Sequence, residues 1–572
     1  MLALSFPTVV VSAAAAQSAS GEASACATSL RLPDGALAGV YADYARAAEL
    51  AGAAPLHPRV IRRPSAQRLL PVCAGAAPNP WRARLQVDSA SAPGELRFEL
   101  VPPRWLTHIN SAYPTDRNDG ALWPGRGVAM SLQGGAAARW VLGWATISAT
   151  LAPAVLFHEN RDFDIRTVDA ARYSPFVYPW HLGRIDWPQR FGESAFWVLD
   201  AGPSQLRVDV RGWTLGVSNE NLWWGPAARY PLLMSNTAPG FLHVFTGTAR
   251  PLDTPIGNVE GQLIWGWLEE SDYFDFRSSN DRRLLAGIIL DYEPRWLPGL
   301  FLGFSRAYLT GIPEEGLPLA DYIRRPYTHL RSNPAGGGNP LADNQLFSVF
   351  MRWAFPAVGF EAYAEWARED HWADIDDLLM EPDHGQAYML GFQKVVPTGG
   401  RWVRLYGELA YLQSATTYRS GRPGVTFYTH TPLVQGYTHR GQLLGAAIGP
   451  GSDAQLLGAD LFGDWGMLGI HFERVRRDND AYYENWARYY GYRGHDVELT
   501  AGVRHHFFDG DFDIGWGLTY STRKNRNFLG LNGLSPALRV DTNWALDLVV
   551  TWSPDLRRIR RPPTLSTRSN DR

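Results

Sequence analysis

Hydrophobic and polar residues alternate one by one along most of the chain after Trp81, which is typical of β-strands with two different faces. In the first such segment, Leu96, Phe98 and Leu100 alternate with charged residues. The same alternation recurs in the segments 205–215, 360–368, 402–411, 466–473, 496–507, 511–518 and 546–550. Each predicted strand therefore has one apolar face and one polar or charged face.

The length of this alternating region predicts one large β-structure rather than several small domains. Strands of about 10 residues, spaced roughly 26 residues apart over 81–553, give about 18 strands, which is in the range of transmembrane barrels. Aromatic residues at strand ends would form the interfacial girdles, and these are Trp265, Trp267, Tyr273, Trp366, Tyr411, Trp516 and Trp552. We expect an all-β fold, a transmembrane antiparallel β-barrel whose apolar faces contact outer-membrane lipid.

One uncharged run, from Trp140 to Phe157, has the length of a membrane helix. It contains Pro153 and many β-branched and aromatic residues, so two strands joined near 151–153 fit it better. Earlier in the chain, residues 35–53 place apolar side chains at helical spacing and are followed by Pro55, which predicts one short amphipathic helix.

These patterns divide the chain into four parts. Residues 1–20 are apolar and end in small residues, which is typical of a secretory signal peptide, although the basic residues that usually begin one are missing. Residues 27–80 would form a small N-terminal helical periplasmic segment, 81–553 the barrel, and 554–572 a basic disordered tail. Cys26 and Cys73 could form a disulfide in an oxidising periplasm or remain two buried thiols.

Composition and motifs exclude several classes of function. The 54 Lys and Arg residues nearly balance 57 Asp and Glu residues, so the chain lacks the net basic surface of a nucleic-acid-binding protein. We found no HExxH or Cys/His array, no GxxxxGK[ST] loop and no convincing GxSxG turn. We therefore expect no metal, no cofactor, no catalytic residue and no enzymatic activity.

The best candidate for a binding site is the segment 219–236. Sugar binding needs flat aromatic rings together with amides, carboxylates and guanidinium groups that bind hydroxyls. This segment supplies Asn219, Asn221, Trp223, Trp224, Arg229 and Asn236. The alternative, which the sequence leaves open, is an interior turn whose Trp pair packs inside the barrel.

A second candidate cluster follows in the segment 361–371, from which we take Glu365 and Arg368 as polysaccharide-binding residues. Its carboxylates could also form a structural lattice with Arg404, Glu408 and Arg504, and we favour that interpretation. Glu361 and Glu365 would lie roughly 13 Å apart along one strand, too far for a glycosidase pair. A cross-strand pair such as Glu365 with Glu408 keeps hydrolysis as an alternative.

Five segments carry a resemblance to a known family. They begin at Gly216 (GVSNENLWWGPAARYPLLMSNTAPGF), Gly247 (GTARP), Leu268 (LEESDYFDF), Tyr363 (YAEWAREDHW) and Gln435 (QGYTHRGQLLGAAIGPGSD). Together they resemble the Wzi family of capsule-assembly proteins, in order over roughly residues 95–555. The resemblance implies an outer-membrane barrel of about 18 strands that acts as a lectin-like anchor for exported polysaccharide.

We therefore expect a monomeric outer-membrane barrel that binds capsular or other surface polysaccharide. Two alternatives remain at this point. A general porin would use the polar inner face as a diffusion channel, and a carboxylate-dependent hydrolase would cleave the polysaccharide.

Overall fold

The computed structural model describes residues 28–33, 37–65, 69–72, 77–89, 93–115, 118–169, 171–328, 343–369, 375–414, 425–531 and 538–554. The expected signal peptide, both cysteines and nearly all of the expected tail lie outside these residues. Within them, helices long and apolar enough to cross a membrane are absent.

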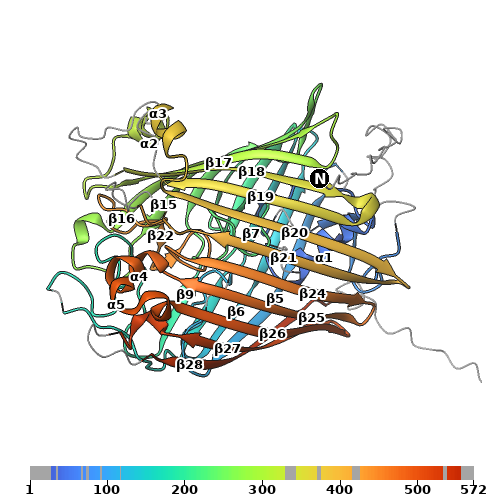
Figure 1. The fold of residues 1–572 in the computed structure, drawn as a ribbon. Helices are drawn as coiled ribbons and strands as arrows, with labels where there is room; N and C mark the ends of the chain where they lie inside the picture. Colours follow the sequence, from blue (N-terminus) through green and yellow to red (C-terminus); the bar gives the residue numbers. More distant parts are fainter. Residues whose placement is uncertain are drawn as a thin grey trace, which may run out of the picture.

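The chain folds into a closed antiparallel β-barrel (Figure 1), as the alternation predicted. Its sheet has 21 strands, which form 18 barrel positions because three positions are each shared by two shorter strands. The barrel closes where β28 (Val540–Trp552) pairs with β5 (Leu96–Asn110) and where β10 (Gln205–Val210) pairs with β7 (Ala145–Leu151).

The remaining barrel strands follow in chain order. They are β6 (Gly127–Val141), β8 (Ala154–His158), β9 (Phe196–Asp200), β11 (Trp213–Ser218), β13 (His243–Thr248), β14 (Leu252–Thr254), β15 (Gly257–Glu269), β16 (Arg282–Pro294), β17 (Leu300–Gly311), β18 (Asp343–Phe355), β19 (Phe360–Glu369), β20 (Gln386–Thr398), β21 (Arg401–Tyr411), β24 (Asp453–Gly463), β25 (Gly466–Arg477), β26 (Asp496–Asp509) and β27 (Phe512–Lys524).

The apolar faces of these strands point outward. Phe98 is 75% exposed and Phe472 62% exposed, whereas buried side chains facing the lumen include Arg352 and Arg404. Among the aromatic residues expected in the girdles, Trp267, Trp516 and Trp552 are exposed. This arrangement is the reverse of a soluble β-sandwich, in which the apolar faces fill the core.

Of two sequence predictions about individual strands, the structure confirms one and contradicts the other. The run 140–157 contains β7 and β8, separated at Ala152 and Pro153 as expected, and both pair with β6. The single strand expected over 205–215 is wrong, because β10 and β11 form a hairpin there. Its two turn residues, Arg211 and Gly212, have φ values of 49° and 89°, as a tight hairpin turn requires.

The two ends of the barrel differ. Short turns join the strands at one end, and the N-terminal segment lies against it, since the Trp81 indole donates to the Gly463 carbonyl at 3.0 Å. The long loops lie at the opposite end (Figure 1) and carry α2 (Leu319–Thr328), α3 (Ile375–Met380), α4 (Asn479–Asn485) and α5 (Ala487–Tyr490). The short helices are η1 (Ser278–Asn280), η2 (Pro356–Val358), η4 (Gly491–Gly494) and η5 (Arg526–Phe528).

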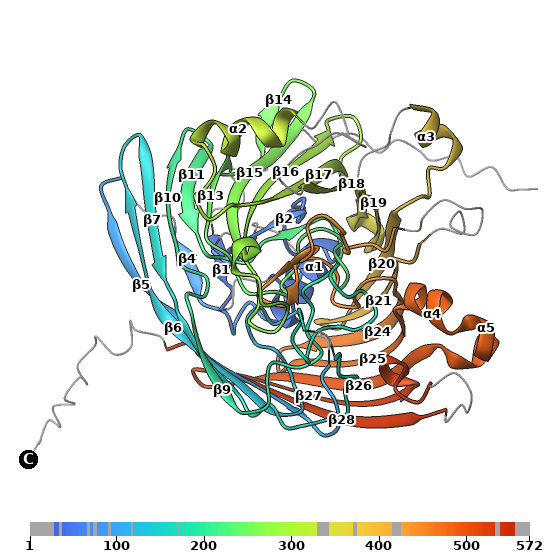
Figure 2. The same cartoon turned by 90° about the vertical axis from the view of Figure 1, so that its left-hand side faces the viewer.

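The predicted N-terminal helix is α1 (Val40–Leu50), and it lies within the ring of strands when the barrel is viewed from the long-loop end (Figure 2). A small sheet of β1 (Thr28–Arg31), β3 (Leu69–Val72) and β4 (Val87–Ser89) accompanies it. Two further strand pairs belong to chain segments outside the barrel sheet: β2 (Ile61–Arg62) with β12 (Trp223–Trp224), and β22 (Thr438–His439) with β23 (Gln442–Leu443). The N-terminal segment therefore contributes to the filling of the barrel.

Candidate functional site

Inward-folded segments fill much of the lumen, and we call them the plug: α1, β2 with the residues beside it, and the loops 219–242 and 426–452. The apolar side chains of β2 and of the two loops form one buried cluster with side chains of the barrel wall. Those of α1 form a second buried cluster with the small N-terminal sheet and the wall. Leu232, Leu233 and Tyr437, for example, are fully buried in it. A barrel filled in this way differs from a wide diffusion channel.

The Trp pair of the candidate segment lies inside this plug. Trp223 and Trp224 are both 0% exposed, and β12 pairs them with Arg62 and Ile61. The Trp223 indole donates to the Ala227 carbonyl at 3.1 Å. The guanidinium of Arg62 lies over the Trp223 ring, with its carbon 4.4 Å from the ring centroid. The Trp pair therefore lies in an interior turn of the plug, and neither ring has an exposed face that could bind a sugar.

Glu408, on β21, holds one loop of the plug in place, the loop 219–242, which we call the plug loop. Its carboxylate accepts hydrogen bonds from three consecutive backbone N–H groups, those of Ala228 (2.8 Å), Arg229 (3.0 Å) and Tyr230 (2.5 Å). The Tyr363 hydroxyl donates to it at 2.9 Å. A buried carboxylate used in this way organises a loop in the manner of an anion-binding turn.

Glu365, on β19, has a similar role on the next part of the loop. It is 1% exposed, and its Oε2 accepts a hydrogen bond from the Leu232 N–H at 3.2 Å. Arg368 is 3% exposed, and its guanidinium donates to the carbonyls of Glu381 and Pro382 at 3.3 and 3.4 Å. Both predicted residues therefore support loops, while Asp370 and His371 of the same cluster lie outside the described residues.

The lattice of Arg and carboxylate groups expected for this cluster exists around Glu361, but with partners other than those expected. Glu361 pairs with Arg352 at 2.7 Å and with Arg46 of α1 at 2.7 Å. Arg352 also pairs with Glu49 of α1 at 2.9 Å. All four side chains are buried, so this network fixes α1 to the wall formed by β18 and β19.

The two Arg residues expected as lattice partners anchor α1 at a different place. Arg404 and Arg504 each pair with Asp43 of α1, at 2.9 and 2.8 Å, and with Asp460 of the wall, at 2.6 and 2.8 Å. Asp43 lies in the helix rather than in a barrel strand. Burial raises the pKa of its carboxyl, but the two guanidinium charges outweigh burial and lower it overall.

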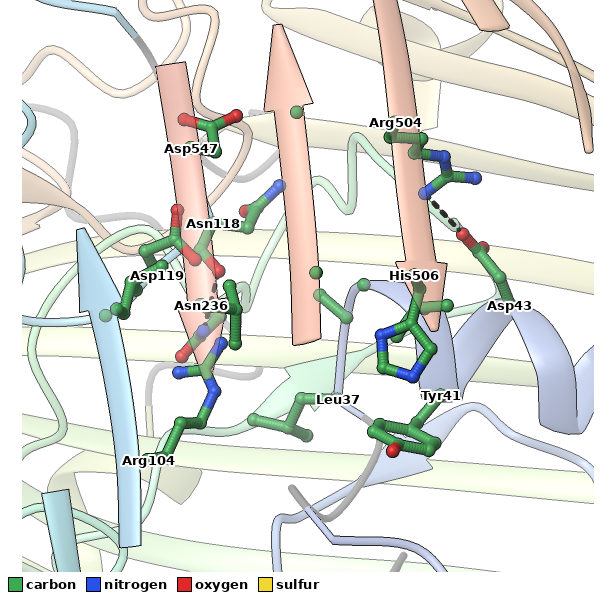
Figure 3. Close-up of a pocket in the computed structure, with 18 of the residues that line it drawn as sticks. Leu37, Tyr41, Asp43, Arg104, Asn118, Asp119, Asn236, Arg504, His506 and Asp547 are labelled. Atoms are coloured by element: carbon green, nitrogen blue, oxygen red, sulfur yellow. Dashed lines mark hydrogen bonds and ion pairs between the residues drawn. The ribbon is translucent and has the colours of Figure 1, made fainter. Parts of the chain in front are cut away.

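Beside the plug lies a cavity of about 440 Å³ (Figure 3). Most of its lining comes from the adjoining wall strands β25 to β28, β5, β6 and β8, and further residues come from β21 and α1. Three of the predicted binding residues line it, namely Asn221, Arg229 and Asn236. The loop residues Asn118 and Asp119 line it as well. Asn219, Trp223, Trp224, Glu365 and Arg368 are not among its lining residues.

Hydrogen bonds fix the polar side chains of this cavity. The Asn236 amide donates to the Asn118 carbonyl at 2.7 Å, and the Asn221 amide donates to the Ala238 carbonyl at 2.7 Å. The side-chain oxygens of both residues lie next to Gly120. A Cβ atom placed on Gly120 would be 3.5 Å from Oδ1 of Asn236 and 3.7 Å from Oδ1 of Asn221. The cavity therefore has fixed amide oxygens that could accept hydrogen bonds from hydroxyl groups.

Acidic residues flank His108 at the same cavity. Its Nδ1 lies 2.7 Å from Asp547 and its Nε2 lies 2.9 Å from Asp119. Two carboxylate acceptors are satisfied only when both ring nitrogens carry hydrogen, as in the imidazolium form. This contact joins the loop that contains Asp119 to the barrel wall.

His181 joins another loop of the lumen, between β8 and β9, to the start of α4. Its Nε2 lies 2.9 Å from Oδ1 of Asp478, which caps α4, and the Tyr178 hydroxyl donates to Oδ2 at 2.7 Å. Burial lowers the pKa of His181, but the Asp478 carboxylate outweighs burial and raises it above the ordinary value of 6.5.

Raising the pH should weaken this contact. A raised pKa in the folded state adds stability that is complete below pH 6.5 and is lost as the pH rises through the folded-state pKa. We expect the melting temperature in detergent to fall more between about pH 6 and about pH 9 for the natural protein than for His181→Gln. An equal fall for both proteins would show that the His181 contact does not contribute to this pH dependence.

Comparison with known proteins places this geometry in context. The sequence profile of a family described as capsule assembly protein Wzi matches residues 203–547, more than half of the chain. A search of curated proteins gave no significant match. Among solved structures, the outer-membrane protein Wzi of Escherichia coli, described as a carbohydrate-binding β-barrel involved in group 1 capsule assembly, aligns with a TM-score of 0.51 and 13% identity. The alignment covers 79% of this chain and 85% of that one.

Two other solved structures align with lower TM-scores. OccK7 (OpdD) of Pseudomonas aeruginosa aligns with a TM-score of 0.38 and 12% identity, over 80% of this chain and 99% of that one. OccK2 (OpdF) of the same organism aligns with a TM-score of 0.36 and 10% identity, over 80% and 98%.

The fold and the filled lumen define an outer-membrane β-barrel of 18 strands. Because the family profile matches most of the barrel, the chain belongs to the Wzi family of capsule assembly proteins.

Proposed function

We propose that this barrel binds exported polysaccharide and helps to retain it on the cell surface without cleaving it. The observation that carries the proposal is the filled lumen, with a polar cavity beside the plug, in a member of the Wzi family. Long loops of bacterial outer-membrane barrels face the outside of the cell, whereas short turns face the periplasm. The loop end would thus meet the polysaccharide.

The residues proposed to bind the sugar are those that line the cavity. Asn221, Arg229 and Asn236 remain from the sequence prediction, and Asn118 and Asp119 join them. Amide and guanidinium groups of this kind bind sugar hydroxyls through paired hydrogen bonds. We further propose that the protein acts as a monomer. The outward-facing apolar residues support a position in the lipid of the outer membrane.

A deletion strain tests the proposal. We expect loss of the gene to leave polysaccharide synthesis intact while a larger fraction is released into the medium, measured as cell-associated and released polysaccharide. Complementation with the natural gene should restore retention. An unchanged cell-associated fraction in the deletion strain would contradict the anchoring role.

The porin alternative makes a different prediction. A porin gives a large and steady current in planar bilayers, whereas the packed plug should keep the natural protein closed. The hydrolase alternative is disfavoured by Glu365 and Glu408, because both carboxylates accept hydrogen bonds from backbone N–H groups of the plug. Release of oligosaccharides by the natural protein, but not by Glu408→Gln, would support hydrolysis instead.

A further inference from the structure

Arg104 differs from the other cations of the cavity in its surroundings. It lies on β5 directly after an irregular stretch, where the pairing of β5 with β6 shifts between Val101 and Arg104. Trp105 beyond the shift faces outward and is 50% exposed, so Arg104 faces the lumen. In Figure 3 its guanidinium extends from β5 toward Asn236.

The neighbours of Arg104 on the barrel wall are neutral. Gln133 of β6 and Thr551 of β28 are its partners in register on either side. The Nε of Arg104 is buried and has no hydrogen-bond partner among the residues that the structure describes. Burying an unpaired nitrogen of a charged group is costly, and the guanidinium has further donors available.

The other cations of the cavity all have acidic partners. Arg404 and Arg504 pair with Asp43, Arg229 lies 3.7 Å from Glu473, and His108 lies between two aspartates. These contacts occupy the acidic groups as well, because Asp119 and Asp547 both contact His108. For Arg104, no carboxylate lies within ion-pairing distance in the described part of the chain.

From this arrangement we infer that the cavity takes a sugar unit bearing a carboxylate, a uronic acid, whose carboxylate pairs with Arg104. A guanidinium binds a planar carboxylate through two parallel hydrogen bonds. The side-chain oxygens of Asn221 and Asn236 could accept hydrogen bonds from the ring hydroxyls. The volume of about 440 Å³ lies within the range of small-ligand sites, about 300–1,000 Å³.

This inference rests on the proposed polysaccharide binding and narrows it to acidic saccharides. A site for an acidic sugar also differs from a site for any small carboxylate, because a free carboxylate would contact Arg104 but would have no hydroxyl groups for the amide oxygens. Binding of a free carboxylate and binding of an acidic sugar can therefore be compared directly.

The test is a titration of the full-length protein in detergent by isothermal calorimetry. The ligands are the trisaccharides of glucuronate and galacturonate, their carboxyl-reduced neutral counterparts, and sodium acetate. We expect at least one acidic trisaccharide to bind at least tenfold more tightly than its neutral counterpart, or about 1.4 kcal/mol. Acetate should bind far more weakly than that trisaccharide.

Two variants of Arg104 and one control complete the design. Arg104→Gln should lose about tenfold in affinity for the acidic trisaccharide and little for the neutral one. Arg104→Lys should be intermediate, because it keeps the charge but lacks the paired donors. The control is Arg295→Gln, which removes an Arg that is 58% exposed and pairs with Asp253 of β14. Neither residue lines the cavity. The control should bind as the natural protein does.

Several results would overturn the inference. They are equal affinity for acidic and neutral trisaccharides, no binding of either acidic trisaccharide, unchanged acidic-sugar affinity in folded Arg104→Gln, and acetate binding as tight as that of the sugar. Folding of each variant is checked by its melting temperature. If the deletion strain sheds polysaccharide while any of these results holds, the proposed function survives and only the assignment of an acidic sugar to Arg104 fails.

Discussion

Replacement of Glu408 by Ala should release the plug loop and open the barrel. The change leaves the N–H groups of Ala228, Arg229 and Tyr230 without their acceptor. Each buried N–H that loses its acceptor costs about 1–3 kcal/mol. We expect a marked loss of unfolding free energy in urea and the appearance of channel openings in planar bilayers.

The control for this variant is Glu269→Ala. Glu269 is also a carboxylate, but its side chain is 51% exposed and pairs with Arg440, which is 46% exposed. An exposed pair of this kind contributes less than about 1 kcal/mol, so the control should stay closed and stable. A folded Glu408→Ala barrel that remained closed would show that Glu408 does not hold the plug.

Replacement of Arg352 by Ala should detach α1 from the barrel wall. The side chains of Arg352, Glu49 and Glu361 are all 0% exposed, so the change leaves two buried carboxylates without this cation. Breaking a buried pair by removing one partner costs about 3–5 kcal/mol. We expect a loss of that size in the unfolding free energy, together with faster proteolysis of the N-terminal segment.

For this variant the matched change is Arg295→Ala. Arg295 pairs with Asp253 at 2.8 Å, but the two side chains are 58% and 80% exposed. We expect a change of less than about 1 kcal/mol for this surface pair. If both Arg variants lost the same small amount, the buried network around α1 would not be what fixes the helix.

The sequence was sufficient to predict the barrel because the two sides of each wall strand meet different surroundings. Phe98 and Phe472 face outward and Arg352 faces inward, so residues alternate with a period of two wherever a strand is regular. The estimate of about 18 positions from the length of the alternating region agrees with the structure, because the short turns of one end and the long loops of the other average out around the barrel. The helix α1 was also predicted, since its apolar residues have helical spacing.

Features that depend on a single irregular residue could not be predicted in this way. The shift between Val101 and Arg104 changes which residues of β5 face the lumen, so extrapolating the alternation from Phe98 would place Arg104 outside. The adjacent Pro102 and Pro103 are a signal of irregularity, but not of its direction. Likewise, the alternation over 205–215 continues through the hairpin turn at Arg211.

The candidate site was predicted only in part because contacts between distant segments decide it. Asn221, Arg229 and Asn236 line the cavity, whereas Trp223 is buried by Arg62, 161 positions earlier in the chain. Asn118 and Asp119 carry no pattern that distinguishes them from other loop residues. Glu408 was recognised as a lumen carboxylate, but its backbone partners become visible only once the plug loop is in place.

Direct binding of the host's own polysaccharide to the purified protein tests the central claim most directly. The protein in detergent is mixed with size-fractionated polysaccharide, and the bound fraction is measured at equilibrium together with the chain length of the recovered polymer. We expect saturable binding and an unchanged chain length. The absence of binding by a folded and closed barrel, or recovery of shortened chains, would contradict a role in retaining intact polysaccharide.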